Sequence, residues 1–99
     1  MTDNVNHPSH YNLPGKKECI EQMREDYGEY ITATFCLTNA YKYLYRAGHK
    51  GSAAEDIDKA RWYYDYFLKI QDDVTFDMAL NNLAMYIENR LEEIKNDRS

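Results

Sequence analysis

The sequence predicts an all-α fold: a compact bundle of three main helices plus a short N-terminal helix, preceded by an extended arm. Apolar residues recur every three or four positions through most of the chain after residue 18, which is typical of amphipathic helices. No segment alternates apolar and polar residues as a half-buried strand does. The 99 residues are enough for one domain with a modest core. We therefore expect an arm over 1–17 and a single helical domain over 18–99.

The beginning of the chain predicts the arm and the short helix. Residues 1–17 are polar and hold both prolines of the chain, so no regular element is expected there. Residues 18–26 are predicted to form a short helix with Ile20 and Met23 turned inward. Gly28 follows and should break this helix.

A longer helix is predicted over 29–47. Ile31, Phe35 and Leu44 follow helical spacing and are expected to face the core. Gly48 stands just after the helix, where a glycine can take the left-handed conformation that ends many helices. The helix should therefore stop at Gly48.

The next helix is predicted over 54–71. Ser52 and Glu55 have the spacing of a capping box, in which each residue satisfies a backbone N–H at the start of the helix. The residues expected to face inward are Ile57, Ala60, Tyr64, Phe67 and Leu68.

The last helix is predicted over 76–95, with Asp73 or Thr75 as its N-cap. One face is lined by Leu80, Leu83, Ala84, Ile87, Leu91 and Ile94. This apolar stripe has two readings. It packs one subunit against another in an oligomer, or it closes the core of a single chain.

Composition and charge exclude several classes of protein. The net charge of −5 makes the chain a poor candidate for binding duplex nucleic acid, where a basic surface supplies most of the affinity. No apolar run is long enough to cross a membrane, so the cytoplasm is the expected location. The two cysteines, Cys19 and Cys36, lack metal-binding spacing and are expected to be reduced, half-buried thiols. Ten tyrosines supply unusual aromatic area, which binding surfaces use.

A cationic patch is predicted at the end of the helix over 29–47. Residues 31–54 contain no Asp or Glu, in a chain that has 17 of them. Asn39, Lys42 and Arg46 share one helical face, and Lys50 follows in a glycine-bounded turn. An amide, cations and turn N–H groups suit phosphate oxygens. Cations also favour helix C-termini for dipole reasons, so a capping and solvation role is the alternative.

The following helix adds residues of the same kinds. Lys59 and Tyr63 are four positions apart, and Trp62 is adjacent. These rings could stack on a base, or Trp62 could belong to the core or to a subunit contact. Asp56 could form an ion pair with Lys59 or with Arg46 across the bend between the helices.

The arm carries His7, His10 and Tyr11, with Pro8 stiffening the segment. Two histidines without a third ligand do not predict a metal site. Hydrogen bonding to a phosphate or a base edge is the expected role, and a polar tail is the alternative. The chain lacks the phosphate-loop, dinucleotide-binding, serine-hydrolase and zinc-protease motifs, so no catalytic residue is assigned and no metal or cofactor is expected.

Several short motifs follow one another along residues 5–68. They are VNHPSHY, ECI, F-x-x-x-NA-x-KYL-x-RAG-x-KG and ED-x-x-KA-x-WY. In this order they resemble the SaV-like family of small phage and prophage proteins, which includes the nucleotide kinase of a short-tailed enterobacterial phage. The chain departs from the family pattern at Thr38, where a small glycine-like residue is expected, and at Tyr45, where tryptophan is common.

The resemblance implies a phage-encoded protein that acts on nucleotides as a homo-oligomer. The positions that match the family motifs are His7, Pro8, His10, Tyr11, Asn39, Lys42, Tyr43, Arg46, Lys50, Asp56, Lys59, Trp62 and Tyr63. The family's kinase is longer than this chain, so the resemblance supports binding better than phosphoryl transfer.

Three functions are compatible with these residues. The first is a nucleotide-binding protein with activity like that of a nucleoside-monophosphate kinase, in which Lys42, Arg46 and Lys50 hold phosphates. The second is a non-catalytic protein that sequesters a nucleotide-derived immune signal of the host. The third is a structural or host-protein-binding module, in which the tyrosines form a protein interface. Nucleotide binding is favoured over protein binding.

Overall fold

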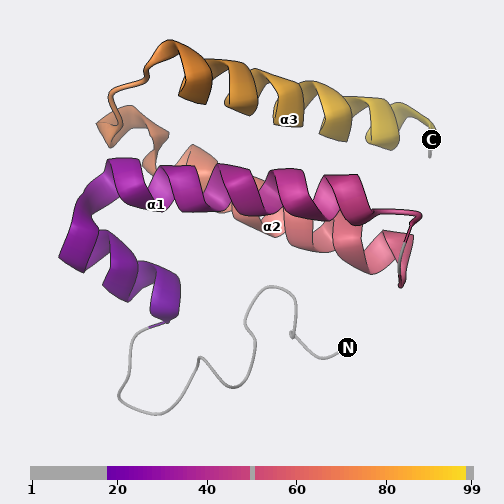
Figure 1. The fold of residues 1–99 in the computed structure, drawn as a ribbon, viewed down its shortest axis with the longest axis horizontal. Helices are drawn as coiled ribbons and strands as arrows, with labels where there is room; N and C mark the ends of the chain where they lie inside the picture. The colour runs from indigo at the N-terminus through magenta and orange to yellow at the C-terminus, as the bar shows by residue number, and fades with distance from the viewer. Residues whose placement is uncertain (1–17, 50, 98–99) are drawn as a thin grey trace.

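The computed structural model describes residues 18–49 and 51–97. It contains the helices α1 (Cys19–Arg46), α2 (Ala53–Ile70) and α3 (Met78–Asp97), with a 3-10 turn, η1 (Gln71–Asp73), between the last two. No strand occurs in these two described ranges, so the predicted all-α fold is confirmed. Figure 1 shows the second part of α1 running along α2, α3 lying along the other side of α1, and the first part of α1 bent away.

The predicted break at Gly28 is a kink inside α1. Gly28 has φ 89° and ψ 175°, a conformation that is essentially restricted to glycine. The short helix expected over 18–26 and the longer helix expected over 29–47 are therefore the two segments of α1, and the predicted break between them is confirmed. The hydroxyl of Thr32 donates to the carbonyl oxygen of Gly28 at 2.9 Å and gives this acceptor a partner at the bend.

Two of the predicted helix boundaries are confirmed and one is wrong. Gly48 has φ 85° at the end of α1, and Ser52 accepts a hydrogen bond from the N–H of Glu55 at 3.3 Å at the start of α2. The start of α3 was expected after Asp73 or Thr75, but its cap is Asp77, which accepts from the N–H of Leu80 at 2.7 Å. The reason is that Asp73 is occupied in η1 and the chain is extended after it.

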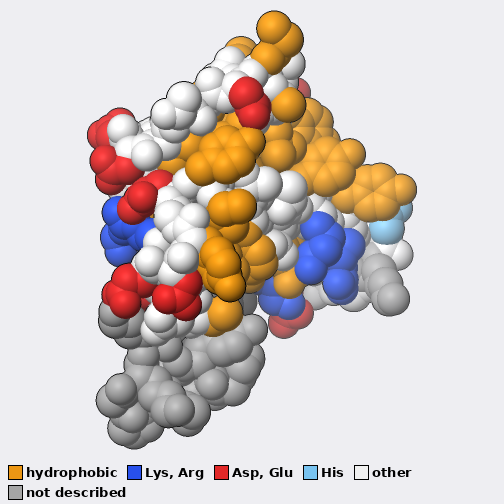
Figure 2. All heavy atoms as spheres, turned by 60° about the vertical axis from the view of Figure 1, so that its left-hand side comes forward, with side chains coloured by type: hydrophobic (Ala, Val, Ile, Leu, Met, Phe, Trp, Pro, Cys, Tyr) orange, Lys and Arg blue, Asp and Glu red, His pale blue; other side chains and the backbone are white. Residues whose placement is uncertain are grey.

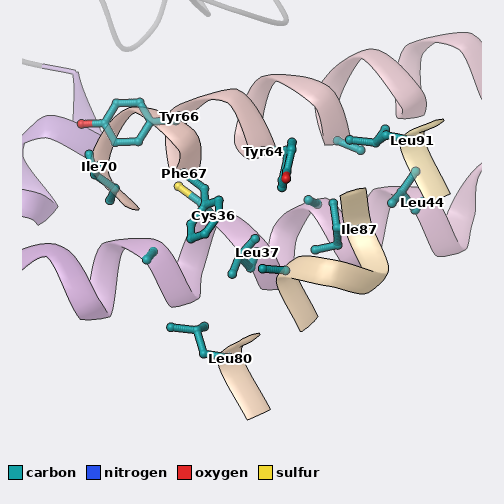
Figure 3. Close-up of a cluster of buried hydrophobic side chains, with 14 of the residues drawn as sticks. Cys36, Leu37, Leu44, Tyr64, Tyr66, Phe67, Ile70, Leu80, Ile87 and Leu91 are labelled. Atoms are coloured by element: carbon teal, nitrogen blue, oxygen red, sulfur yellow. The ribbon is translucent and has the colours of Figure 1, made fainter. Parts of the chain in front are cut away.

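The core lies where the three helices meet. Figure 3 shows Cys36 and Leu37 of α1 facing Phe67 of α2, with Leu80 and Ile87 of α3 approaching from the other side. The apolar stripe of α3 is buried within the single chain: Leu80, Ala84, Ile87 and Leu91 are at most 9% exposed. Of the two readings of this stripe, closure of the chain's own core is the one realised. No helix in the described part of the chain is long and apolar enough to cross a membrane.

Two residues expected in the core face outward. Ile31 is 50% exposed and Leu68 is 41% exposed. Ile31 lies on the side of α1 opposite to that packed on α2, because the covered face of α1 is set by residues such as Ala33, Cys36 and Ala40. Helical spacing identified an apolar position correctly but not which of two apolar faces would be covered.

The two cysteines differ more than expected. Cys36 is completely buried, and Cys19 is exposed, so the expectation of two half-buried thiols is wrong for both. Burial raises the pKa of the Cys36 thiol to about 12. Since the thiolate is the reactive form, this thiol should be inert in the folded protein.

Substitution of Gly28 tests the kink. We expect Gly28→Ala to lower the free energy of unfolding by about 1–3 kcal/mol, because alanine is strained at this φ and ψ. Urea unfolding followed by circular dichroism measures this. Gln22→Ala, at an exposed position of the same helix, should change stability by roughly 0.5 kcal/mol or less. A Gly28→Ala protein as stable as the wild type would show that α1 can straighten without loss.

Thiol labelling tests the cysteine environments. With an aromatic disulfide reagent at neutral pH, one thiol per chain should react quickly, and it should be Cys19. The second, Cys36, should react only when denaturant is added, because both its burial and its raised pKa protect it. Cys19→Ser should abolish the fast phase, whereas fast labelling of the Cys19→Ser protein would contradict the buried position of Cys36.

Candidate functional site

The C-terminal end of α1 lies beside the N-terminal end of α2, because only six residues, 47–52, connect them. An ion pair joins the two ends, with Arg46 Nε 3.7 Å from Asp56 Oδ1. Of the two partners expected for Asp56, Arg46 is the one observed. Asp56 is 3% exposed, and its Oδ2 accepts no hydrogen bond from the described residues. Arg46 Nε also lacks a hydrogen-bond partner among the described residues, so it is charge attraction that holds the guanidinium group near the buried carboxylate.

Three cations from the two helices converge on the ring of Tyr43. Lys42 Nζ lies 4.5 Å from the ring centroid, Lys59 Nζ lies 5.4 Å away and Arg46 Cζ lies 5.9 Å away. Cations at such distances are attracted by the negative face of the ring. They also repel one another, which an anion placed between them would relieve. The residues predicted for the patch on α1 and for α2 are thus brought to one place.

The aromatic side chains extend this cluster along α2. The rings of Tyr43 and Tyr63 are nearly parallel, at 8°, with centroids 6.1 Å apart. Trp62 meets Tyr63 edge-on at 5.1 Å and lies one ring further from the cations. Figure 2 shows a group of lysine and arginine side chains directly beside a band of hydrophobic side chains. A planar group bound next to the cations would find aromatic surface at hand.

Two of the expected donors are at least partly used within the chain. The amide nitrogen of Asn39 donates to the carbonyl oxygen of Phe35 at 2.8 Å, one turn earlier in α1. In the turn after α1, the N–H of Ala47 donates to Tyr43 and the N–H of His49 to Arg46. The expectation that N–H groups of the glycine-bounded turn are free for phosphate is therefore wrong for His49, whose N–H helps to complete the end of the helix.

Four of the predicted site residues lie outside the described residues: His7, His10, Tyr11 and Lys50. Their proposed roles stay predictions. The described members are Asn39, Lys42, Tyr43, Arg46, Asp56, Lys59, Trp62 and Tyr63, and all of them belong to α1 or α2.

Two residues of the cluster were not predicted. Phe35 meets Tyr63 edge-on at 5.7 Å, and Tyr66 stacks on Trp62 at 5.9 Å. Helical spacing carries the signal for both, since Phe35 is eight positions before Tyr43 and Tyr66 is four after Trp62. Phe35 was expected to face the core, and no role was predicted for Tyr66.

A hollow of about 400 Å³ lies elsewhere, near the kink in α1. It is lined by Glu21, Arg24, Glu25, Glu29 and Tyr66. Three carboxylates line it, and Arg24 is already paired with Glu29 at 3.0 Å, so this hollow is a poor site for an anion. Across the described ranges, no three His, Cys, Asp or Glu side chains come together as metal ligands would.

The family model that matches this chain covers residues 5–65 and is described as DUF3310, a protein family of unknown function. The chain belongs to the DUF3310 family. All twelve predicted site residues lie inside the matched segment, whereas α3 lies beyond it.

A phage protein is also similar. The Gene 1.7 protein of Enterobacteria phage T3 is 36% identical over 72 residues, which are 70% of this chain and 44% of that protein. The chain thus corresponds to less than half the length of this relative. No solved structure matches the chain significantly.

Substitution of the buried carboxylate tests the charge balance of the cluster. We expect Asp56→Asn to lower the free energy of unfolding by about 1–3 kcal/mol, because Arg46 loses its charged partner and the three cations repel without compensation. The loss should shrink as salt is added. Urea unfolding at low and high ionic strength measures both effects. Asp58→Asn, at an exposed position of the same helix, is the control, and an equal loss in both variants would contradict this role of Asp56.

Proposed function

We propose that this chain is a phage nucleotide-binding protein, whose cations around Tyr43 bind the phosphate groups of the nucleotide. The observation that carries the proposal is the convergence of Lys42, Arg46 and Lys59 on one ring. Nothing in the overall charge of −5 favours such a concentration of positive charge. Sites that hold phosphate combine several cations in this way.

The aromatic neighbours support a nucleotide over a simple inorganic anion. Tyr43, Tyr63 and Trp62 lie within one cluster that continues from the cations along α2. Bases stack on tyrosine and tryptophan rings with little dependence on sequence. A ligand with a phosphate at one end and a flat base at the other therefore matches both halves of the cluster.

The placement of Arg46 supports a pre-organised site. Its guanidinium is held by a carboxylate that is itself buried, so the side chain loses less freedom when an anion binds. Arginine at the end of a helix also has a dipole role, but this explains neither Lys42, a turn earlier, nor Lys59, which comes from the other helix.

A fluorescence titration tests the proposal. Trp62 is the single tryptophan and lies against Tyr63, so its emission should report ligand binding. Nucleoside mono-, di- and triphosphates and cyclic nucleotides are the ligands, and the corresponding nucleosides are the controls. Binding should also raise the melting temperature in proportion to the logarithm of ligand concentration. We expect phosphate-bearing ligands to bind and unphosphorylated nucleosides to bind much more weakly.

Variants locate the site. The double variant Lys42→Ala/Arg46→Ala should weaken binding by at least about a hundredfold, because each charge-assisted contact contributes about 1.5–3 kcal/mol. Arg90→Ala/Lys95→Ala is the matched control, since it also removes two positive charges but from α3, which contributes no residue to the cluster. Equal loss of affinity in both variants would indicate a non-specific charge effect.

The fate of the bound nucleotide separates two roles. Chromatography of the released ligand shows conversion if the protein transfers a phosphoryl group, as in the kinase-like reading. An unchanged ligand indicates sequestration. Absence of binding by any nucleotide in the titration would overturn the proposal and leave the protein-interaction reading.

A further inference from the structure

The second part of α1 has a neutral outer face. Residues 30–41 contain no charged side chain, although this helix has solvent along one side. The face is formed by Tyr30, Ile31, Thr34, Thr38, Tyr41 and Tyr45. Tyr30, Ile31 and Tyr41 are 45–50% exposed, and Tyr45 is 73% exposed. A surface helix normally carries charged residues on its outer side, so this face has the composition of a covered one.

The polar atoms of this face are already satisfied within the chain. The hydroxyl of Thr34 donates to the carbonyl oxygen of Tyr30 at 2.9 Å, and that of Thr38 donates to the carbonyl oxygen of Thr34 at 2.8 Å. The hydroxyl of Tyr30 donates to Asp77 at 2.8 Å. Because these donors have partners, removing water from the face leaves few of its polar groups unsatisfied.

The exposed apolar surface continues onto α3. Tyr41 lies against Tyr86, whose ring centroid is 5.6 Å away, and Met78 and Met85 of α3 are 80% and 54% exposed. Figure 2 shows hydrophobic side chains forming a band across this side of the molecule. With about 200 Å² for each tyrosine side chain, the exposed parts of Tyr30, Tyr41, Tyr45 and Tyr86 together contribute roughly 400 Å². A stable interface buries about 800 Å² of each partner, and adding the other apolar residues approaches this.

We propose that this neutral face of α1 is the interface between two copies of this chain. In a two-fold dimer each surface patch meets its own copy, so a charged patch would meet like charges. The chain has a net charge of −5, and the stretch without charged residues avoids that repulsion. Tyrosine and methionine enrichment with few charges is typical of interface cores.

The order of residues along the face matches an antiparallel pairing of two α1 helices. A two-fold axis at the height of residue 36 places Thr34 of one copy opposite Thr38 of the other. The same axis places Ile31 opposite Tyr41. Small side chains then lie at the centre, where the helices approach most closely, and large ones lie on both sides. The interface would border the cationic cluster, since Lys42 lies one helical turn after Thr38.

Light scattering coupled to size-exclusion chromatography tests this inference with the full chain. The wild type should have at least twice the chain mass of 11.8 kDa. Ile31→Glu should weaken self-association at least tenfold, because it places two carboxylates in the interface. Leu68→Glu, which changes an exposed leucine of α2, should assemble as the wild type does. Circular dichroism and melting confirm that both variants are folded, as their exposed positions lead us to expect.

A charge pair tests the antiparallel arrangement. In the double variant Ile31→Glu/Tyr41→Lys, the acidic and basic side chains face each other across the two-fold axis, and self-association should return to within about threefold of the wild type. A monomeric wild-type protein would overturn the inference, as would an Ile31→Glu protein that assembles normally. Failure of the double variant to recover would overturn the antiparallel pairing. None of these results depends on nucleotide binding, which is measured separately.

Discussion

The close packing of α1 against α2 is the interaction on which the candidate site depends. Ala33, Ala40 and Ala60 are completely buried in the core that these helices share. Helices approach one another more closely where small side chains form the contact. Close approach lets Lys59, from α2, reach the same ring as Lys42 and Arg46 of α1. Larger residues at these alanine positions would hold the two helices further apart. Lys59 would then lie further from Lys42 and Arg46, although no residue of the cluster had been changed.

Local signals in the sequence were sufficient for the elements and for most of the cluster. The serine cap of α2, the glycine at the end of α1 and the break at Gly28 each depend on a few neighbouring residues. The pairing of Arg46 with Asp56 could also be expected, because a short connection between two helices forces their adjoining ends together. These features need no knowledge of how α3 packs.

Other features depend on tertiary packing and could not be derived from spacing. The second part of α1 is apolar on both sides, so spacing alone could not show that Ile31 faces outward while Ala33 is buried. The cap of α3 moved to Asp77 because η1 uses the residues before it and because Tyr30 of α1 also binds that carboxylate. The contact of Phe35 with Tyr63 depends on how α1 packs against α2, whereas the contact of Tyr66 with Trp62 lies within α2 and follows from their spacing.

The cluster illustrates how charge is distributed in a small acidic protein. Three cations lie around one aromatic ring, and one buried carboxylate lies nearby. The cations repel one another, and this repulsion disfavours the folded chain when no anion is bound. Such local conflict is expected where a protein binds a charged ligand. The acidic hollow at the kink has the opposite character, so the two ends of α1 present different potentials.

The helical hairpin formed by α1 and α2 also bears on the order of folding. The described site residues span only positions 39–63, and the turn between the helices is short. Contacts between residues that are near in sequence form early, because little chain entropy is lost in closing the loop. The cationic cluster can therefore assemble as the hairpin closes, before α3 docks and completes the core. Mutations in α3 would then act mainly on how long the folded state persists and less on how fast the site forms.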